Sequence, residues 1–157
     1  INDHEPASVL RLVASGEVDT VQVIYNIFDQ SPERELFPLC QKHSVGVIVR
    51  VPFDEGSLVG AVGPDTVFPE QDFRNRYFRG ERRAQVVERV EKLRALLGEE
   101  ARTLPELALR FCLHPPAVST VIPGMRSVRT VVAFCAVWDG RWLCHGLLVS
   151  LLLHAWV

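Results

Sequence analysis

The chain has 157 residues, of which 48% are apolar and 23% charged, and its formal net charge is −2. This length suits one domain with a single core, and the apolar fraction excludes an intrinsically disordered chain. The balanced charge argues against general nucleic-acid binding, because phosphates would have to be neutralised by Lys and Arg. Four widely spaced cysteines without a C-x-x-C pair predict buried thiols in a reducing, cytoplasmic compartment.

Three short runs rich in Val and Ile predict β-strands. They span residues 18–26, 45–52 and 117–123. Each run is nearly continuously apolar, which is typical of a parallel strand that is buried on both faces.

Helix signals separate these runs. A short helix is predicted over residues 6–14, before the first strand. Ser31 followed by Pro32 predicts the start of a second helix, in which Pro38 should bend the axis or cost a hydrogen bond.

The second half of the sequence predicts three more helices. Apolar residues recur at helical spacing from Val86 to Leu97, and Gly98 ends the pattern. The segment 103–106 has the form of a capping box, and Ser127 can cap a last amphipathic helix that reaches about Val137.

The final segment is unusual. From Trp142 to Val157 there is no Asp, Glu, Lys or Arg. The run is shorter than the roughly 20 residues of a membrane span, so a membrane role is disfavoured and a helix packed on the core is favoured. An interfacial or membrane helix and a frame-shifted sequence remain as alternatives. We therefore expect one domain over residues 1–157 with an atypical apolar tail at 138–157.

Strands that alternate with helices indicate a parallel sheet with right-handed crossovers. Three strands are too few for a doubly wound sheet and amount to about half of a (β/α)8 barrel. The sequence therefore predicts an α/β fold: a partial (β/α)8 TIM barrel, with about three parallel strands and flanking helices. The chain starts at Ile1 without a signal peptide, which indicates a start within a larger coding sequence.

Ligands of such barrels bind at the carboxyl ends of the strands. Gln22 interrupts the first strand, and a buried carboxamide needs partners from either a neighbouring backbone or a ligand amide. Arg50, in the second strand, must pair with a carboxylate or face a ligand. Asp54 and Glu55 follow in a loop, where we expect both to be solvated.

After the third strand, Gly124 lies between the strand and the start of a helix. Backbone N–H groups at such a turn can bind an anion, and Arg126 and Arg129 add positive charge, so the turn predicts a phosphate site. Five arginines lie in the segment 74–83, where a solvated lead-in to a helix or a flap over an anionic ligand is favoured over nucleic-acid binding. The histidines lack metal-ligand spacing, and no metal is predicted.

Residues 21–60 and 103–127 resemble the aldo-keto reductase family, in particular its bacterial oxidoreductase-like members, and the likeness extends over about residues 1–130. The resemblance implies the C-terminal half of the family's barrel, beginning just after the fifth strand. It also implies NADP as cofactor, with hydride passing from NADPH to a small carbonyl substrate while a Tyr protonates the oxygen.

The same resemblance assigns cofactor-binding roles. Gln22 matches the residue that binds the nicotinamide carboxamide, and Arg50 matches the residue that packs on the nicotinamide ring. The following loop matches the segment along the pyrophosphate, through Pro52, Phe53, Gly56 and Leu58. The turn and helix after the last strand match the site of the adenosine phosphate, through Gly124, Arg126 and Thr130.

Two features depart from the family pattern. Val132 and Phe134 stand where members usually have Glu and Asn, which implies weaker binding of adenine. The family's catalytic Asp, Tyr, Lys and His come from its first four strands, and no residue here matches them. We therefore expect no catalytic residue in this chain, and a partner that is either the complementary N-terminal half-barrel or a second copy. The alternatives are a non-catalytic scaffold or binding protein and a degenerate gene product.

Overall fold

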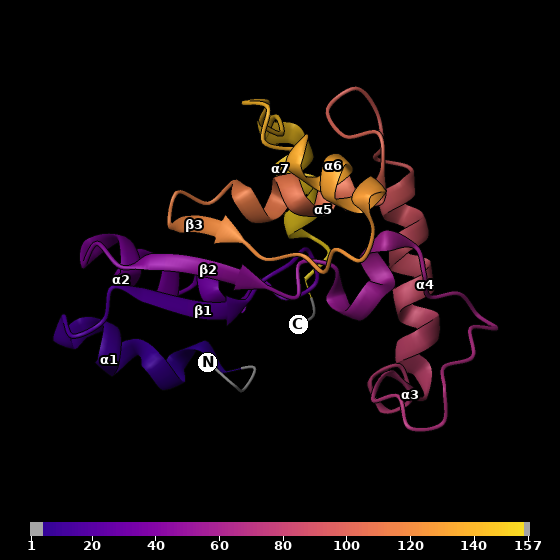
Figure 1. The fold of residues 1–157 in the computed structure, drawn as a ribbon, viewed down its shortest axis with the longest axis horizontal. Helices are drawn as coiled ribbons and strands as arrows, with labels where there is room; N and C mark the ends of the chain where they lie inside the picture. Colours follow the sequence, from indigo (N-terminus) through magenta and orange to yellow (C-terminus); the bar gives the residue numbers. More distant parts are fainter. Residues whose placement is uncertain (1–4, 156–157) are drawn as a thin grey trace.

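The computed structural model describes residues 5–155 and is built around a three-stranded parallel sheet (Figure 1). Its strands are β1 (Thr20–Ile24), β2 (Gly46–Arg50) and β3 (Val118–Val121), in the spatial order β1-β2-β3. All three lie within the predicted ranges, and both pairs are parallel, as predicted. The outermost residues of the predicted domain and tail, 1–4 and 156–157, lie outside the described part.

The remaining elements are helical and connect or follow the strands. They are η1 (Pro6–Val9), α1 (Leu10–Ser15), η2 (Ser31–Glu33), α2 (Leu36–Lys42), η3 (Asp54–Val59), α3 (Arg74–Tyr77), α4 (Glu81–Arg94), α5 (Leu104–Leu113), α6 (Val128–Cys135) and α7 (His145–Leu152).

Two predicted helix caps are confirmed. The Thr103 hydroxyl accepts a hydrogen bond from the Glu106 N–H at the start of α5 (3.3 Å). Ser127 begins α6 by accepting from the Thr130 N–H (3.2 Å). The prediction for Pro38 is wrong, because α2 begins at Leu36 and places this proline in the first turn. The first-turn N–H groups of a helix have no intrahelical acceptor, so Pro38 forfeits no hydrogen bond.

The core lies between one face of the sheet and the helices that connect the strands. Val21, Val23, Val47 and Val49 point to this face, and all are buried. Beyond the end of β1, Tyr25 stacks on Phe111 of α5 (5.3 Å between ring centroids) and meets Phe37 of α2 edge-on (4.9 Å), so aromatic rings tie both helices to the strand.

The opposite face of the sheet is open. Side chains alternate along a strand, and on this face Thr20 and Gln22 are exposed while Ile48 and Arg50 are half-buried. The prediction that each strand is buried on both faces is therefore wrong for the described residues. The physical reason is that three strands form only part of a barrel wall, and within the described residues this face is covered only at its end, where Ile24 is 6% exposed.

We expect the 157-residue chain to self-associate in solution. The two outer strands each pair along one edge only, and an open sheet edge next to an uncovered face is a template for further pairing. Light scattering should give a mass above that of one chain, increasing with concentration. A monomer with a sharp, cooperative melting transition would contradict this expectation.

The apolar tail folds partly onto the core, in agreement with the favoured interpretation. Leu151 of α7 is fully buried, whereas Leu153 is exposed. The Gln30 amide donates to the Leu151 carbonyl (3.1 Å), and the Arg89 guanidinium donates to the His154 carbonyl (2.6 Å), so the tail lies against the β1 loop and α4. No helix within residues 5–155 has the length and apolarity needed to cross a bilayer.

The four cysteines are free thiols. Cys40 and Cys112 are buried, as predicted, and burial raises the pKa of both. Cys135 and Cys144 are exposed, and for them the prediction of burial is wrong. Both belong to elements at the periphery, because α6 has no buried residue and Cys144 lies at the N-cap of α7.

Candidate functional site

The loop that follows β2 has an unusual backbone. Val51, Asp54 and Glu55 have φ angles of 55°, 43° and 55°, and Gly56 has a φ of 104°. Positive φ is uncommon for residues other than glycine and is costly for a β-branched residue such as Val51. Such conformations persist where the surrounding structure enforces them, and they cluster at functional sites.

The buried carboxylate of Asp54 anchors this loop through hydrogen bonds. It is 2% exposed and accepts hydrogen bonds from the Ser57 hydroxyl (2.6 Å) and the Tyr77 hydroxyl (2.5 Å). The Arg82 guanidinium donates to the Tyr77 hydroxyl (2.8 Å) and lies 3.8 Å from Asp54. Burial and the neighbouring carboxylate raise the pKa of Tyr77. The prediction that Asp54 is solvated is wrong, because the distant segment 74–83 folds back to cover it.

The turn after β3 presents a different surface. Gly124, Arg126 and Ser127 are exposed, and Ser127 opens α6 with a capping box that uses the N–H groups of Ser127 and Thr130. The N–H groups of Val128 and Arg129, in the same first turn, have no intrahelical acceptor. Within residues 5–155, neither Arg126 nor Arg129 forms an ion pair. A helix N-terminus flanked by two free guanidinium groups attracts anions.

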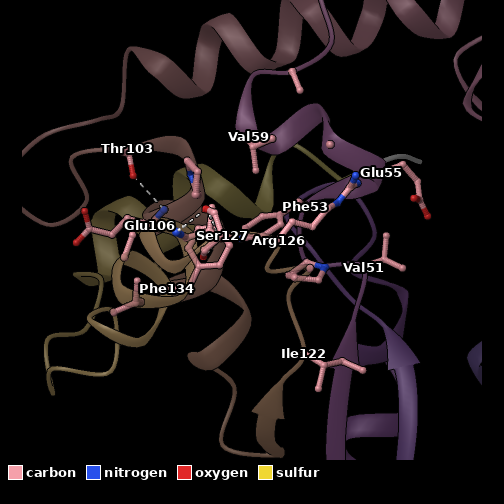
Figure 2. A pocket seen from close by; sticks show the side chains of 18 of the residues that line it. Val51, Phe53, Glu55, Val59, Thr103, Glu106, Ile122, Arg126, Ser127 and Phe134 are labelled. Carbon is pink, nitrogen blue, oxygen red and sulfur yellow. Dashed lines mark hydrogen bonds between the residues drawn. The ribbon is translucent and has the colours of Figure 1, made fainter. Parts of the chain in front are cut away.

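These two segments face each other across one cleft of about 1450 Å³ (Figure 2). Its size exceeds the roughly 300–1,000 Å³ of pockets for drug-sized molecules and suits an extended ligand. Six of the predicted cofactor residues line it: Pro52, Phe53, Gly56, Gly124, Arg126 and Thr130. Figure 2 labels Phe53, Arg126 and Ser127 among the side chains that line the cleft.

Three predicted cofactor residues are placed elsewhere. Gln22 lies outside this cleft, on the open face of the sheet. Arg50 ends β2 on the same face, next to Val51, which lines the cleft. The side chain of Leu58 is 1% exposed and belongs to the core. The structure thus brings together the residues matched to the adenosine phosphate and, except for Leu58, those matched to the pyrophosphate, and leaves the nicotinamide-side residues on the inner face.

Sequence reasoning missed a buried ionic network behind α6. The Arg110 guanidinium, on α5, is 3% exposed and donates to Glu106 (3.0 Å), to Asp139 (2.9 Å) and to the Arg141 carbonyl (2.6 Å). Arg110 and Arg141 hold the pKa of Asp139 well below its usual range. The i, i+4 spacing of Glu106 and Arg110 was visible in the sequence, but Asp139 could not be linked to them. The network fixes the end of α6 and hence one wall of the cleft.

A second, smaller cleft of about 770 Å³ lies at the carboxyl ends of β1 and β2. It is lined by Asn26, Tyr77, Arg82 and, from the tail, Leu152. Asn26 is buried and joins the two strand ends, because its amide donates to the Val51 carbonyl (3.0 Å) while its oxygen accepts from the Phe28 N–H (2.9 Å). Among residues 5–155, no group of His, Cys, Asp and Glu is arranged to hold a metal ion.

Comparison with known proteins identifies relatives of the chain. The model of the aldo/keto reductase family matches residues 4–140. The NADH-specific methylglyoxal reductase of Escherichia coli (strain K12) is 30% identical over 109 residues, which are 69% of this chain and 33% of that protein. The pyridoxal 4-dehydrogenase of Microbacterium luteolum is 28% identical over 103 residues, covering 66% of this chain and 28% of that protein.

Comparison with solved structures also identifies aldo-keto reductases. The holo form of the aldo-keto reductase AKR11C1 from Bacillus halodurans superposes with a TM-score of 0.69 at 27% identity, over 98% of this chain and 48% of that one. The glycerol dehydrogenase AKR11B4 from Gluconobacter oxydans shares the fold, with a TM-score of 0.74 at 20% identity, over 84% and 40% of the two chains. The chain thus spans about half the length of these solved relatives and about a third of the curated ones. By its sequence and its fold, this chain belongs to the aldo/keto reductase family.

Proposed function

We propose that the chain supplies the cofactor cradle of an NADP-dependent aldo-keto reductase, which passes hydride from NADPH to a small carbonyl substrate. The observation that carries this proposal is the single cleft that gathers six of the nine residues assigned to the cofactor. One relative is named NADH-specific, so the choice of NADP for this chain rests on Arg126 and Arg129.

The residues on the cleft fit an extended, anionic cofactor. Arg126 and the N-terminus of α6 would hold the adenosine phosphate, and the strained loop around Phe53 and Gly56 would lie along the pyrophosphate. Gln22 and Arg50, on the inner face, would hold the nicotinamide end. When bound, the cofactor supplies the hydride, and this chain supplies binding and orientation.

The proton that accompanies hydride transfer needs another source. Tyr25 and Tyr77 are the tyrosines of this chain, and each hydroxyl donates to a carboxylate, that of Glu33 and that of Asp54 respectively. Burial raises the pKa of both phenols, which makes them poorer acids. We propose that a complementary half-barrel supplies the proton donor and covers the open face, in the reducing cytoplasmic compartment that free cysteines favour.

The 157-residue chain alone is therefore expected to show no carbonyl reductase activity. Without an acid beside the nicotinamide, hydride transfer to an aldehyde or ketone lacks its proton. The measurement is NADPH oxidation at 340 nm with common aldehydes and ketones. Turnover above the no-protein background would overturn the assignment of catalysis to another part of the enzyme.

In contrast to catalysis, binding of the cofactor's adenosine phosphate end is expected in the 157-residue chain alone. Calorimetric titration with adenosine 2′,5′-bisphosphate, which carries the phosphate that distinguishes NADP from NAD, should show saturable binding. The Arg11→Ala variant is a matched control, because Arg11 is exposed on α1, away from the cleft, and this variant should bind as the wild type does. Absence of binding to the wild-type chain would contradict the proposed function.

A further inference from the structure

We propose that Tyr77 and Arg82 are positioning residues for the cofactor, because they hold the loop 51–60 in the conformation that binds the pyrophosphate. They act through Asp54, and neither of them lines the larger cleft in which the cofactor binds. This inference rests on the proposed function and adds two residues on which affinity at the same site depends. It also assigns a role to the arginine-rich segment 74–83.

The loop 51–60 separates the two clefts. Val51 and Glu55, both labelled in Figure 2, line the larger cleft and the smaller one. Of these two clefts, Phe53 lines only the larger, whereas Asp54 lines only the smaller. The carboxylate of Asp54 therefore lies on the side of the loop that faces away from the cofactor. Groups that bind this carboxylate affect the cofactor through the loop.

Asp54 is held from within the loop and from the segment 74–83. Its Oδ2 accepts a hydrogen bond from the Ser57 hydroxyl (2.6 Å), and its Oδ1 accepts one from the Tyr77 hydroxyl (2.5 Å). Because the Tyr77 oxygen accepts from the Arg82 guanidinium (2.8 Å), the single phenol hydrogen is directed to Asp54. The guanidinium carbon also lies 4.3 Å from the centroid of the Tyr77 ring, so Arg82 fixes both the ring and its hydroxyl.

The loop depends on this support because its backbone is strained. Val51, Asp54 and Glu55 have positive φ angles, which are unfavourable for residues other than glycine. A strained conformation persists only where the surrounding structure enforces it. Loss of the hydrogen bond from Tyr77 therefore lets the loop relax and lowers the fraction of molecules that can bind the pyrophosphate. The apparent dissociation constant rises in inverse proportion to that fraction.

The test uses two ligands that share the adenosine 2′-phosphate. Adenosine 2′-monophosphate lacks the pyrophosphate, whereas 2′-phospho-ADP-ribose carries it, so only the longer ligand reaches the loop 51–60. Both are titrated by calorimetry into the wild-type chain and into Tyr77→Phe, which removes the hydroxyl and keeps the ring beside Arg82. We expect Tyr77→Phe to bind the longer ligand about tenfold more weakly and the shorter ligand within about twofold of the wild type.

Tyr25→Phe is the matched control. The Tyr25 hydroxyl also donates to a carboxylate, but its acceptor is Glu33 of η2 and not a residue of the loop 51–60. This variant should keep the wild-type affinity for both ligands. Asp54→Ala tests the route of the effect. It should weaken the longer ligand, and adding Tyr77→Phe to it should cause no further loss, because the hydroxyl acts through the carboxylate.

Four results would overturn the inference and leave the proposed function in place. They are an unchanged affinity of Tyr77→Phe for the longer ligand, an equal loss for both ligands, the same selective loss in Tyr25→Phe, and full additivity of Tyr77→Phe with Asp54→Ala. Binding of neither ligand by the wild type would overturn the proposed function and this inference together. If Asp54→Ala fails to fold, the ratio of the two affinities in Tyr77→Phe decides alone, because general loosening of the fold weakens both ligands.

Discussion

Replacing Arg110 by methionine is expected to lower the free energy of unfolding by about 1–3 kcal/mol. The guanidinium is buried between Glu106 and Asp139, and methionine fills a similar volume without a charge or a donor. The variant leaves Glu106, Asp139 and the Arg141 carbonyl without their shared donor, although Asp139 keeps its hydrogen bonds from Arg141. Urea unfolding, followed by circular dichroism, measures the difference.

Lys92→Met is the matched control for that substitution. Lys92 also pairs with a glutamate one helical turn away, Glu88 (2.7 Å), but both side chains are more than half exposed. Exposed pairs of this kind contribute little to stability, so Lys92→Met should change the free energy of unfolding much less than Arg110→Met. Equal destabilisation by the two substitutions would show that the network around Arg110 is no stronger than a surface ion pair.

The same network predicts an acid-labile fold. Hydrogen bonds from Arg110 and Arg141 hold the pKa of Asp139 below its ordinary value in the folded chain. A carboxylate with a depressed pKa contributes stability that is fully present above its unfolded pKa of about 3.9 and is lost as the pH falls toward the folded value. Wild-type stability should therefore fall steeply below about pH 4, and the fall should be shallower in Arg110→Met, which lacks the main donor to Asp139.

The Arg126→Ala variant is expected to lose NADPH affinity by about ten- to a hundredfold and NADH affinity by far less. Hydrogen bonds to charged groups contribute about 1.5–3 kcal/mol, and NADH has a ribose hydroxyl where NADPH has a phosphate. Arg126 is exposed at the rim of the cleft, so salt should screen it and the difference between the two cofactors should shrink as ionic strength rises.

Titration of both cofactors into the wild type, Arg126→Ala and the Arg11→Ala control separates a phosphate contact from a change in net charge. Equal losses for NADPH and NADH, or none, would make Arg126 a solvated residue at the start of a helix. A loss of similar size in Arg11→Ala would assign the effect to overall charge.

Local patterns in the sequence were sufficient to predict the strands, their parallel pairing and the caps at Thr103 and Ser127, because each depends on a few neighbouring residues. Asp54 could not be predicted, since its burial depends on Tyr77 and Arg82, which lie more than twenty positions away. The burial of the strand residues that face the inside of the barrel was predicted wrongly for a similar reason. A run of Val and Ile is typical of a strand that is buried on both faces in a complete barrel. In this structure the exposure of each side chain depends on which other strands are present.

The candidate site was predictable to the extent that it consists of contiguous segments. The loop 51–60 and the turn 122–127 were both recognised, and the structure places them across one cleft. The contact between Phe53 and Phe134 was not predicted, because it depends on the angle at which α6 leaves the turn. That angle is fixed in part by Arg110 and Asp139, which are 29 positions apart in the sequence.

The order of the strands in the sheet, which is also their order in the chain, bears on how the molecule folds. The first crossover, from β1 to β2, occupies residues 25–45, whereas the second, from β2 to β3, occupies 51–117. Loop-closure entropy grows with length, so the first unit closes early and the second late. The cleft lies between the two ends of the longer crossover and is therefore completed in the last closure step. A ligand that bridges Phe53 and Arg126 would stabilise the product of that step and act as a template for folding.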